Sequence, residues 1–362
     1  MLVYKIALSL IPSVGDRIAK KLVSYCGSVE AVFNEKKSNL LKIPGIGEIV
    51  ANSVIKQKVL ARAEEEVLFI EKHNITPVFY LDDNYPNRLK HCSDSPLMLY
   101  YKGNADLNHE KIIAIVGTRN ATEYGKKCCI DLVADLVPHN PIIISGLAYG
   151  IDICAHKASL ENGLKTIGVM AHGLDRIYPN VHKSVSKKMA EQGGLITDYM
   201  SQTNPDRENF PSRNRIIAGM ADAVIVVEAA KKGGALITAD IANSYNRDVF
   251  AFPGRIGDEY SAGCNHLIKI NRAALIQSAA DIEYLMGWTK IKEKKSVQKK
   301  LFVELSSDEQ ILFDILNTEG NKDIDYLSFK SNLPMSKASA LLLGLEFKGM
   351  VNSLPGKVYK VN

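Results

Sequence analysis

Short apolar runs alternate with amphipathic segments through the middle of this chain, and this rhythm restricts the fold more than any other feature. Most of the later runs are β-branched and almost continuously apolar, as strands buried on both faces of a sheet are. Strand–helix alternation is typical of βαβ units with right-handed crossovers. The sequence therefore predicts an α/β core over residues 73–288, a Rossmann-like, doubly wound, mostly parallel sheet. The strands expected are Thr76–Leu81, Leu97–Lys102, Ile112–Gly117, Pro141–Gly146, Thr166–Ala171, Gly194–Asp198, Ala223–Glu228, Val249–Pro253 and Ala273–Ile276.

An internal repeat occupies the segment before this core. The sequence IPSVGDRIA at 11–19 recurs as IPGIGEIVA at 43–51, and each copy fits a helix, a tight glycine turn and a second helix. This is the helix-hairpin-helix pattern, and it predicts an all-α, SAM-like domain over residues 1–72. The backbone N–H groups of such a turn can hold one DNA phosphate, but the same turn also serves as a plain connection between helices. The repeat leaves both roles open.

The C-terminal part has a different character. Residues 289–300 contain six lysines without strong periodicity and are expected to form a solvated linker. Residues 301–362 fit a winged helix, with Ser307 as N-cap of the first helix and Gln310 completing its capping box. The module carries more acidic than basic side chains, so we expect protein contact or self-association rather than duplex binding. The later helices are expected at Asp325–Ser331 and Ser336–Lys348, before two short strands around Pro355-Gly356.

Composition excludes several classes of protein. The net charge is only +5, so a site for a polyanion must be a local cluster of cations. The six cysteines show no CxxC or framework spacing, which indicates reduced thiols and a cytoplasmic protein. No apolar stretch is long enough to span a membrane. GxGxxG, Walker A and metal-ligand spacings are missing, so no cofactor and no metal are expected, and His156 is expected to be structural.

Polar residues follow several of the predicted strands, at the edge where open α/β sheets bind their ligands. Cations occur there together with the aromatic residues Tyr149 and Phe210, a combination suited to single-stranded nucleic acid. The alternative is that the arginines form salt bridges with core acids such as Glu228 or Asp240. The basic residues concerned are Arg119, Arg213, Arg215, Lys231 and Lys232.

At these residues the sequence resembles the DNA-processing protein A (DprA/Smf) family. The segments that carry the resemblance run in order through the core: IVGTR at 115–119, SGLAYGIDICAH at 145–156, TIGVMAHGLDRIYP at 166–179, FPSRNRIIAGMADAVIVVEA at 210–229, GGALITADIA at 233–242 and VFAFPG at 249–254. The flanking helix-hairpin-helix and winged-helix patterns agree with that family, so the resemblance covers essentially the whole chain.

The resemblance implies a non-catalytic protein that binds single-stranded DNA and helps load the RecA recombinase onto it during natural transformation. It also implies a homodimer formed through the core. Phe210 would stack on a base and Arg119 would contact a phosphate, while Thr197-Asp198 departs from the family's usual Ser-Glu pair. The DNA-binding residues implied or predicted are Gly117, Thr118, Arg119, Ser145, Gly146, Arg207, Phe210, Arg213, Asn214, Arg215, Lys231, Lys232, Gly233 and Gly234.

A second resemblance belongs to another class. The Gly-Gly element at 233–234 is similar to that of the lysine-decarboxylase-like phosphoribohydrolases, which are nucleotide-binding enzymes with a Rossmann-like core. Those enzymes need a PGGxGTxxE loop whose glutamate acts in catalysis. Here Leu236 and Ile237 replace the Gly-Thr pair and Asp240 replaces the glutamate. The departures favour a binding protein over this enzyme.

Overall fold

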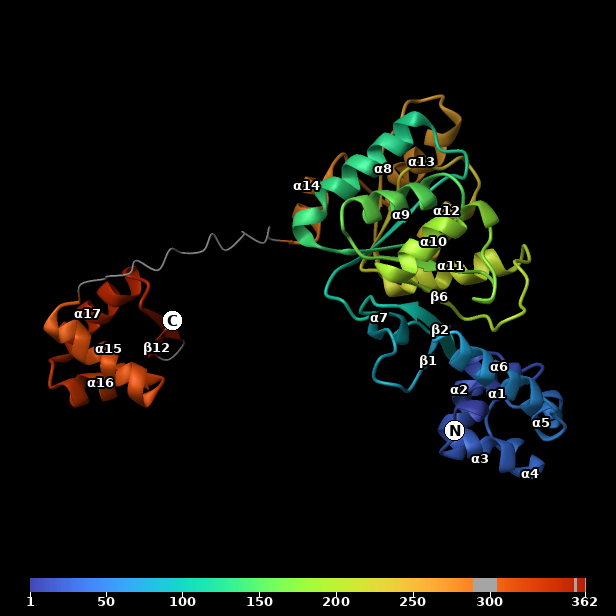
Figure 1. The fold of residues 1–362 in the computed structure, drawn as a ribbon, viewed down its shortest axis with the longest axis horizontal. Coiled ribbons are helices and arrows are strands. Elements are labelled where there is room, and N and C mark those ends of the chain that lie inside the picture. Colours follow the sequence, from blue (N-terminus) through green and yellow to red (C-terminus); the bar gives the residue numbers. More distant parts are fainter. Residues whose placement is uncertain (289–304, 355–356, 362) are drawn as a thin grey trace. The chain divides into compact units, whose positions relative to one another are not determined.

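The computed structural model describes residues 1–288, 305–354 and 357–361. The chain divides into two compact units, Met1–Lys290 and Ile291–Asn362 (Figure 1). The linker expected at 289–300 lies outside the described residues. Among the helices described, none combines the length and the apolar character that crossing a membrane requires.

A nine-stranded sheet forms the centre of the larger unit, in the order β1-β2-β6-β5-β4-β3-β7-β8-β9. The strands from β6 to β9 in this order are parallel, and β2 pairs antiparallel with both β1 and β6. The mostly parallel, doubly wound sheet is thereby confirmed. The strand order reverses between β3 and β7, since β4, β5 and β6 follow on one side and β8 and β9 on the other. The strands are Thr76–Phe79 (β1), Met98–Gly103 (β2), Ile112–Val116 (β3), Ile142–Ser145 (β4), Thr166–Val169 (β5), Gly193–Thr197 (β6), Ala223–Val226 (β7), Asp248–Ala251 (β8) and Ala274–Leu275 (β9).

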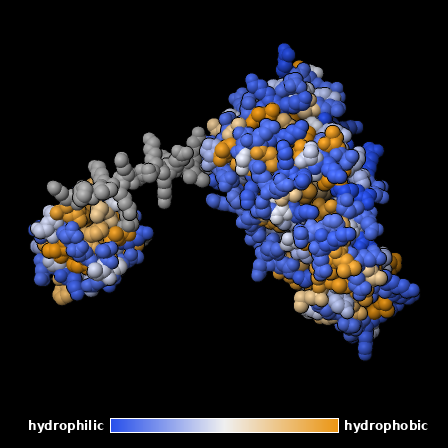
Figure 2. Space-filling view, in the orientation of Figure 1, coloured by the Kyte–Doolittle hydropathy of each residue, from blue (hydrophilic) through white to orange (hydrophobic). Residues whose placement is uncertain are grey.

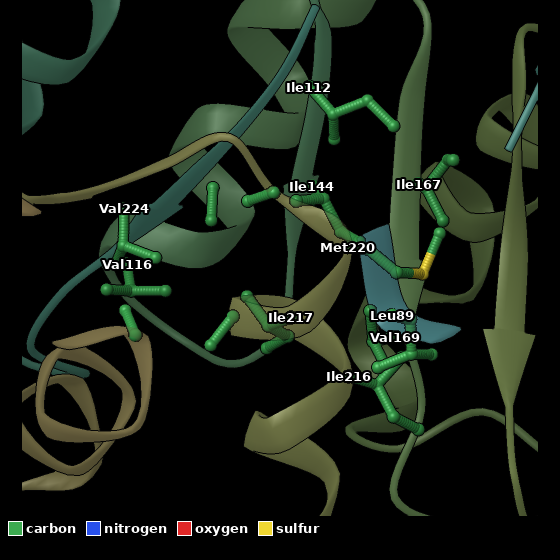
Figure 3. Close-up of a cluster of buried hydrophobic side chains, with 14 of the residues drawn as sticks. Leu89, Ile112, Val116, Ile144, Ile167, Val169, Ile216, Ile217, Met220 and Val224 are labelled. Atoms are coloured by element: carbon green, nitrogen blue, oxygen red, sulfur yellow. The ribbon is translucent and has the colours of Figure 1, made fainter. Parts of the chain in front are cut away.

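Helices cover both faces of this sheet because its central strands are apolar on both sides (Figure 1). One face packs against α8, α9 and α14, and the other packs against α7, α11, α12 and α13. On the second of these faces, three residues of α11 lie over three residues of the strands (Figure 3). The helix residues are Ile216, Ile217 and Met220, and the strand residues are Val116, Ile144 and Val169. The helices are Asn87–Lys90 (α7), Glu123–Asp135 (α8), Ile151–Glu161 (α9), Lys183–Glu191 (α10), Asn209–Met220 (α11), Gly234–Ser244 (α12), Ala262–Lys269 (α13) and Ala279–Leu285 (α14).

Six helices precede the sheet, and their core is continuous with it. Phe79, Leu97, Met98 and Tyr100, in and beside β1 and β2, join the same buried cluster as the helical residues. The first glycine turn therefore meets the sheet domain, where Asp16 Oδ1 accepts a hydrogen bond from the Leu97 N–H at 2.8 Å. The six are Leu2–Leu10 (α1), Asp16–Cys26 (α2), Val29–Asn34 (α3), Lys37–Leu40 (α4), Glu48–Ile55 (α5) and Leu60–Lys72 (α6).

The smaller unit is a winged helix, with a three-stranded sheet beside three helices. The predicted N-cap of its first helix is wrong by one residue, because the capping box joins Ser306 and Glu309 instead of Ser307 and Gln310. The Glu309 carboxylate accepts from the Ser306 N–H at 2.8 Å and also pairs with Lys348 at 2.7 Å. Its elements are Ser307–Glu319 (α15), Lys322–Asp323 (β10), Ile324–Ser331 (α16), Met335–Phe347 (α17), Val351–Leu354 (β11) and Val358–Val361 (β12).

Candidate nucleic-acid interface

The loops that follow β3 and β4 pack directly on one another. The Ile151 N–H, at the start of α9, donates to the Thr118 carbonyl at 3.2 Å. A Cβ at Gly150, where φ is +77°, would lie 2.1 Å from the same carbonyl, and one at Gly117 would lie 2.5 Å from Ile151. Glycine is required at both positions, since any side chain would separate the two loops. This contact brings the Gly-Thr-Arg segment beside the Ser-Gly segment, as predicted.

Ser145 and Gly146 form the floor of this site. Ser145 is fully buried, and its hydroxyl donates to the Ile115 carbonyl at 2.6 Å. The next residue, Leu147, is buried with φ +55°, a backbone conformation that non-glycine residues adopt at a cost and mostly at functional loops. Burial raises the pKa of Asp152 at the start of α9, against the opposing effect of the Arg213 charge. The floor is thus a tightly packed turn under a buried arginine.

Arg213 and Asn214 tie α11 to the ends of three other elements. Arg213 is 4% exposed, and its Nη1 donates to the Gly146 carbonyl at 2.7 Å and also to the Val169 carbonyl. Its Nη2 donates to no residue that the structure describes. The side-chain amide of Asn214 donates to the Gly234 carbonyl at 3.4 Å, which links α11 to the start of α12. These contacts keep one terminal nitrogen of Arg213 available for a ligand.

Two guanidinium groups lie close to the ring of Phe210. The Cζ of Arg119 is 5.6 Å from the ring centroid and that of Arg213 is 6.0 Å away. Burial is the main cause that lowers the pKa of Arg213 to about 10, and the charge of Arg119 contributes to the shift, although Asp152 opposes it. Two cations beside one aromatic ring repel each other, and an anion between them would relieve that repulsion.

The remaining predicted residues lie at the margin of this group or away from it. Lys231, Lys232, Gly233 and Gly234 are exposed, and they precede or begin α12, whose start Asn214 holds. Arg207 is exposed in the segment before α11, and no contact joins it to the others within the described residues. The structure therefore brings Arg119, Phe210 and Arg213 into one compact centre, and the other predicted cations lie exposed around it or away from it.

Arg215 is not brought into the centre. Two residues after Arg213 on a helix, its side chain points about 200° around the axis. Its Nη2 donates to Asp198 at 2.8 Å and to Asp16 of α2 at 3.0 Å. The guanidinium thus joins the helical segment to the end of β6, and Asp198 has a structural partner. The alternative of a salt bridge with a core acid, which the sequence left open for each arginine, applies here.

Two residues of this neighbourhood were missed from the sequence. Tyr178 follows β5, and its ring centroid lies 5.9 Å from that of Phe210. The buried His172 accepts a hydrogen bond from the Tyr178 N–H through Nε2 at 3.2 Å. Both belong to the 166–179 segment at a strand end, and that position was the available signal. His156, by contrast, is structural as predicted, since it is fully buried against Thr166 Oγ1 at 2.6 Å.

The fold and the site define a class: a Rossmann-type α/β protein with a cationic, aromatic site at the carboxyl edge of its sheet. The model of the DNA recombination-mediator protein A family matches residues 76–287. The helix-hairpin-helix motif matches residues 5–57 and the DprA winged helix domain matches residues 303–357. The chain belongs to the DNA recombination-mediator protein A (DprA/Smf) family.

Individual relatives agree with this assignment. Protein Smf of Synechocystis is 31% identical, with 99% of this chain and 98% of the relative covered. The DNA processing protein DprA of Streptococcus pneumoniae is 43% identical over 56% of this chain and 71% of its own length. An X-ray structure of that DprA matches with a TM-score of 0.68 and 33% identity, covering 78% of this chain and 98% of the other. A Helicobacter pylori DprA structure, described for its single-stranded DNA binding mode, matches with a TM-score of 0.54 and 29% identity over 59% and 95%.

Proposed function

We propose that the chain binds single-stranded DNA at the centre formed by Arg119, Phe210 and Arg213. The observation that carries the proposal is the proximity of the Phe210 ring to two guanidinium groups, neither of which forms an ion pair within the described residues. Other arginines of the chain, such as Arg88 and Arg215, do pair with carboxylates. An unpaired cation couple beside an aromatic face suits a ligand with a phosphate and a base.

The arrangement assigns a task to each group. Arg119 is exposed and takes a phosphate. The buried Arg213 offers Nη2 to the same anion, while two backbone carbonyls hold its Nη1 and Asn214 Oδ1 accepts from its Nε. Phe210 is half-buried, so one face of the ring is supported by protein while a base covers the remainder. Lys231 and Lys232 attract the strand through screened charge. Arg207 has the same role, and Arg215 we assign to holding the domains together.

The wider function that we infer is DNA processing in transformation and recombination, with this chain helping to load RecA onto the bound strand in the cytoplasm. Membership of the recombination-mediator family and the single-stranded DNA binding mode of the Helicobacter pylori relative support this inference. We also propose a homodimer formed through the core. The edge strand β9 supports it, because Leu275 is 46% exposed there and Ile270 nearby is 44% exposed.

The alternative phosphoribohydrolase activity has no support from the loop at α12. Asp240, which stands where that family has its glutamate, is exposed and pairs with Arg272 at 2.8 Å. Its carboxylate is one methylene shorter than that of the family's glutamate, and it already has a partner in Arg272. We therefore propose a binding protein without catalytic activity.

The experiment is a fluorescence-anisotropy titration of labelled oligothymidylate at several salt concentrations. Arg119→Ala should weaken binding about tenfold and flatten the salt dependence by roughly one counterion. Arg272→Ala removes the same charge from an exposed ion pair away from the centre and serves as the matched control. If wild-type protein shows no preference for single over double strands, the proposal fails. Wild-type affinity in folded Arg119→Ala would remove Arg119 from the site.

A further inference from the structure

Tyr178 presents an aromatic face beside Phe210. Its side chain is 47% exposed, and its ring is tilted 57° from that of Phe210 at a centroid distance of 5.9 Å. Its hydroxyl has no hydrogen-bond partner among the described residues. Two buried tyrosines of the same unit differ, since the hydroxyls of Tyr85 and Tyr101 donate to the carbonyls of Pro96 and Ala105 at 2.7 and 3.0 Å. Neither burial nor a hydroxyl bond accounts for an aromatic ring at position 178.

The backbone under this exposed ring is nevertheless held in place by a buried group. His172 is 1% exposed, and its Nε2 accepts the Tyr178 N–H while its Nδ1–H donates to the Gly173 carbonyl at 2.9 Å. Accepting through Nε2 requires the neutral imidazole, and burial lowers the pKa of His172 in that direction. The backbone that carries this exposed ring is thus fixed, which reduces the entropy cost of ordering the segment on a ligand.

We propose that Tyr178 is a second base-stacking residue, so that Phe210 and Tyr178 receive two consecutive bases of one strand. The inference rests on the function proposed above and extends it by one nucleotide beyond the arginines. The rings are tilted 57° from one another, so two bases that each lie flat on one ring are not parallel, and the bound strand is unstacked here. A duplex cannot open its base step in this way without losing stacking, and the pair of rings therefore selects single strands.

The order of the elements fits this path. Arg119 follows β3, Tyr178 follows β5, and Phe210 begins α11 between them, in contact with both. A DNA strand whose phosphate lies at Arg119 and whose base covers Phe210 continues towards the end of β5. The next ring that it meets is Tyr178.

The test compares three variants at position 178 by anisotropy titration with oligothymidylate. Tyr178→Ala should weaken binding about tenfold without changing the salt slope, because stacking releases no counterions. Tyr178→Phe should bind as wild type does. Tyr178→Leu keeps apolar contact with Phe210 but lacks a flat ring, so it should resemble the alanine variant. The matched control is Tyr25→Ala, which removes a 60% exposed tyrosine from the C-terminal end of α2.

A second measurement identifies the contact directly. Photo-crosslinking with an oligonucleotide that carries 5-iodouracil, followed by mass spectrometry, should place crosslinks on both Tyr178 and Phe210. Wild-type affinity in Tyr178→Leu, or crosslinks on Phe210 alone, would overturn the proposal and leave Tyr178 as a support for Phe210. Both results would leave the Arg119→Ala effect in place, so failure of this inference is distinguishable from failure of the proposed function.

Discussion

The guanidinium of Arg213 lies directly against the α-carbon of Gly146. A Cβ at position 146 would come within 2.6 Å of both terminal nitrogens, a distance that real Cβ atoms do not reach. Arg213 cannot retreat, because its Nη1 already donates to the carbonyls of Gly146 and Val169. The absence of a side chain at Gly146 is therefore what allows a buried cation to lie at the end of β4.

This contact predicts the effect of Gly146→Ala. Displacing Arg213 should reduce affinity for single-stranded DNA by at least tenfold and destabilise the fold by about 1–3 kcal/mol. Chemical denaturation and anisotropy titration measure the two effects. The control is Gly344→Ala in α17, since a Cβ there would meet only Glu309 Oε1, at an ordinary contact distance of 3.5 Å. Unchanged affinity in Gly146→Ala would show that Arg213 takes no part in binding.

Arg215→Ala should lower the stability of the fold and leave the affinity for single-stranded DNA almost unchanged. It leaves the buried carboxylate of Asp198 without its cation, and such a loss costs on the order of 3 kcal/mol. The folded variant should still bind single-stranded DNA within about twofold of wild type. Arg215→Ala combined with Asp198→Asn should recover part of the stability, because the uncompensated charge is gone. A loss of affinity as large as that of Arg119→Ala would return Arg215 to the DNA site.

Stability should fall with acidification because of His156. Burial lowers the pKa of His156 to about 3, whereas an unfolded histidine titrates near 6.5. The unfolded state then binds the extra proton as the pH falls below 6.5. The free energy of unfolding should therefore decrease by up to ~1.4 kcal/mol per pH unit from this group between pH 6.5 and 3.

Urea denaturation at pH 7, 6 and 5 measures this slope. His156→Asn should reduce the slope of the unfolding free energy against pH by up to the equivalent of one bound proton. The same change at the exposed His266 should leave the slope as it is. An unchanged slope in His156→Asn would contradict the assignment of the proton to this residue.

The winged helix should bind duplex DNA weakly. Its third helix, α17, contains Lys337, which pairs with Asp308 at 2.6 Å, and Lys348 caps the same helix and pairs with Glu309 at 2.7 Å. Leu343 and Phe347 are exposed on α17, and apolar side chains are visible on the surface of this unit (Figure 2). The isolated fragment 301–362, titrated with duplex at ~50 mM salt, should show a dissociation constant above about 100 µM. Micromolar binding would make it a DNA-binding module.

The order of elements was predictable because it depends on local sequence. All nine strands of the large sheet occur where apolar runs predict them, with ends that differ by a few residues. The location of Arg119 and Phe210 at one edge of the sheet was also predictable, because chain segments that follow parallel strands meet at that edge whatever the details of packing. The capping box was placed one residue late because Ser306, Ser307, Glu309 and Gln310 offer two overlapping patterns. In the structure Ser306 and Glu309 form the box, and Glu309 also pairs with Lys348, 39 residues further along the chain.

What the sequence by itself determined is the set of candidate DNA-binding residues, and what the tertiary structure decided is which of them lie together. Arg213 and Arg215 look alike in the sequence, and helix geometry sends one into the site and the other to Asp198 and Asp16. The role proposed for Tyr178 depends on its contacts with His172 and Phe210. The physical reason is that a side chain's environment depends on contacts between segments distant in the chain, and periodicity within one segment does not encode them.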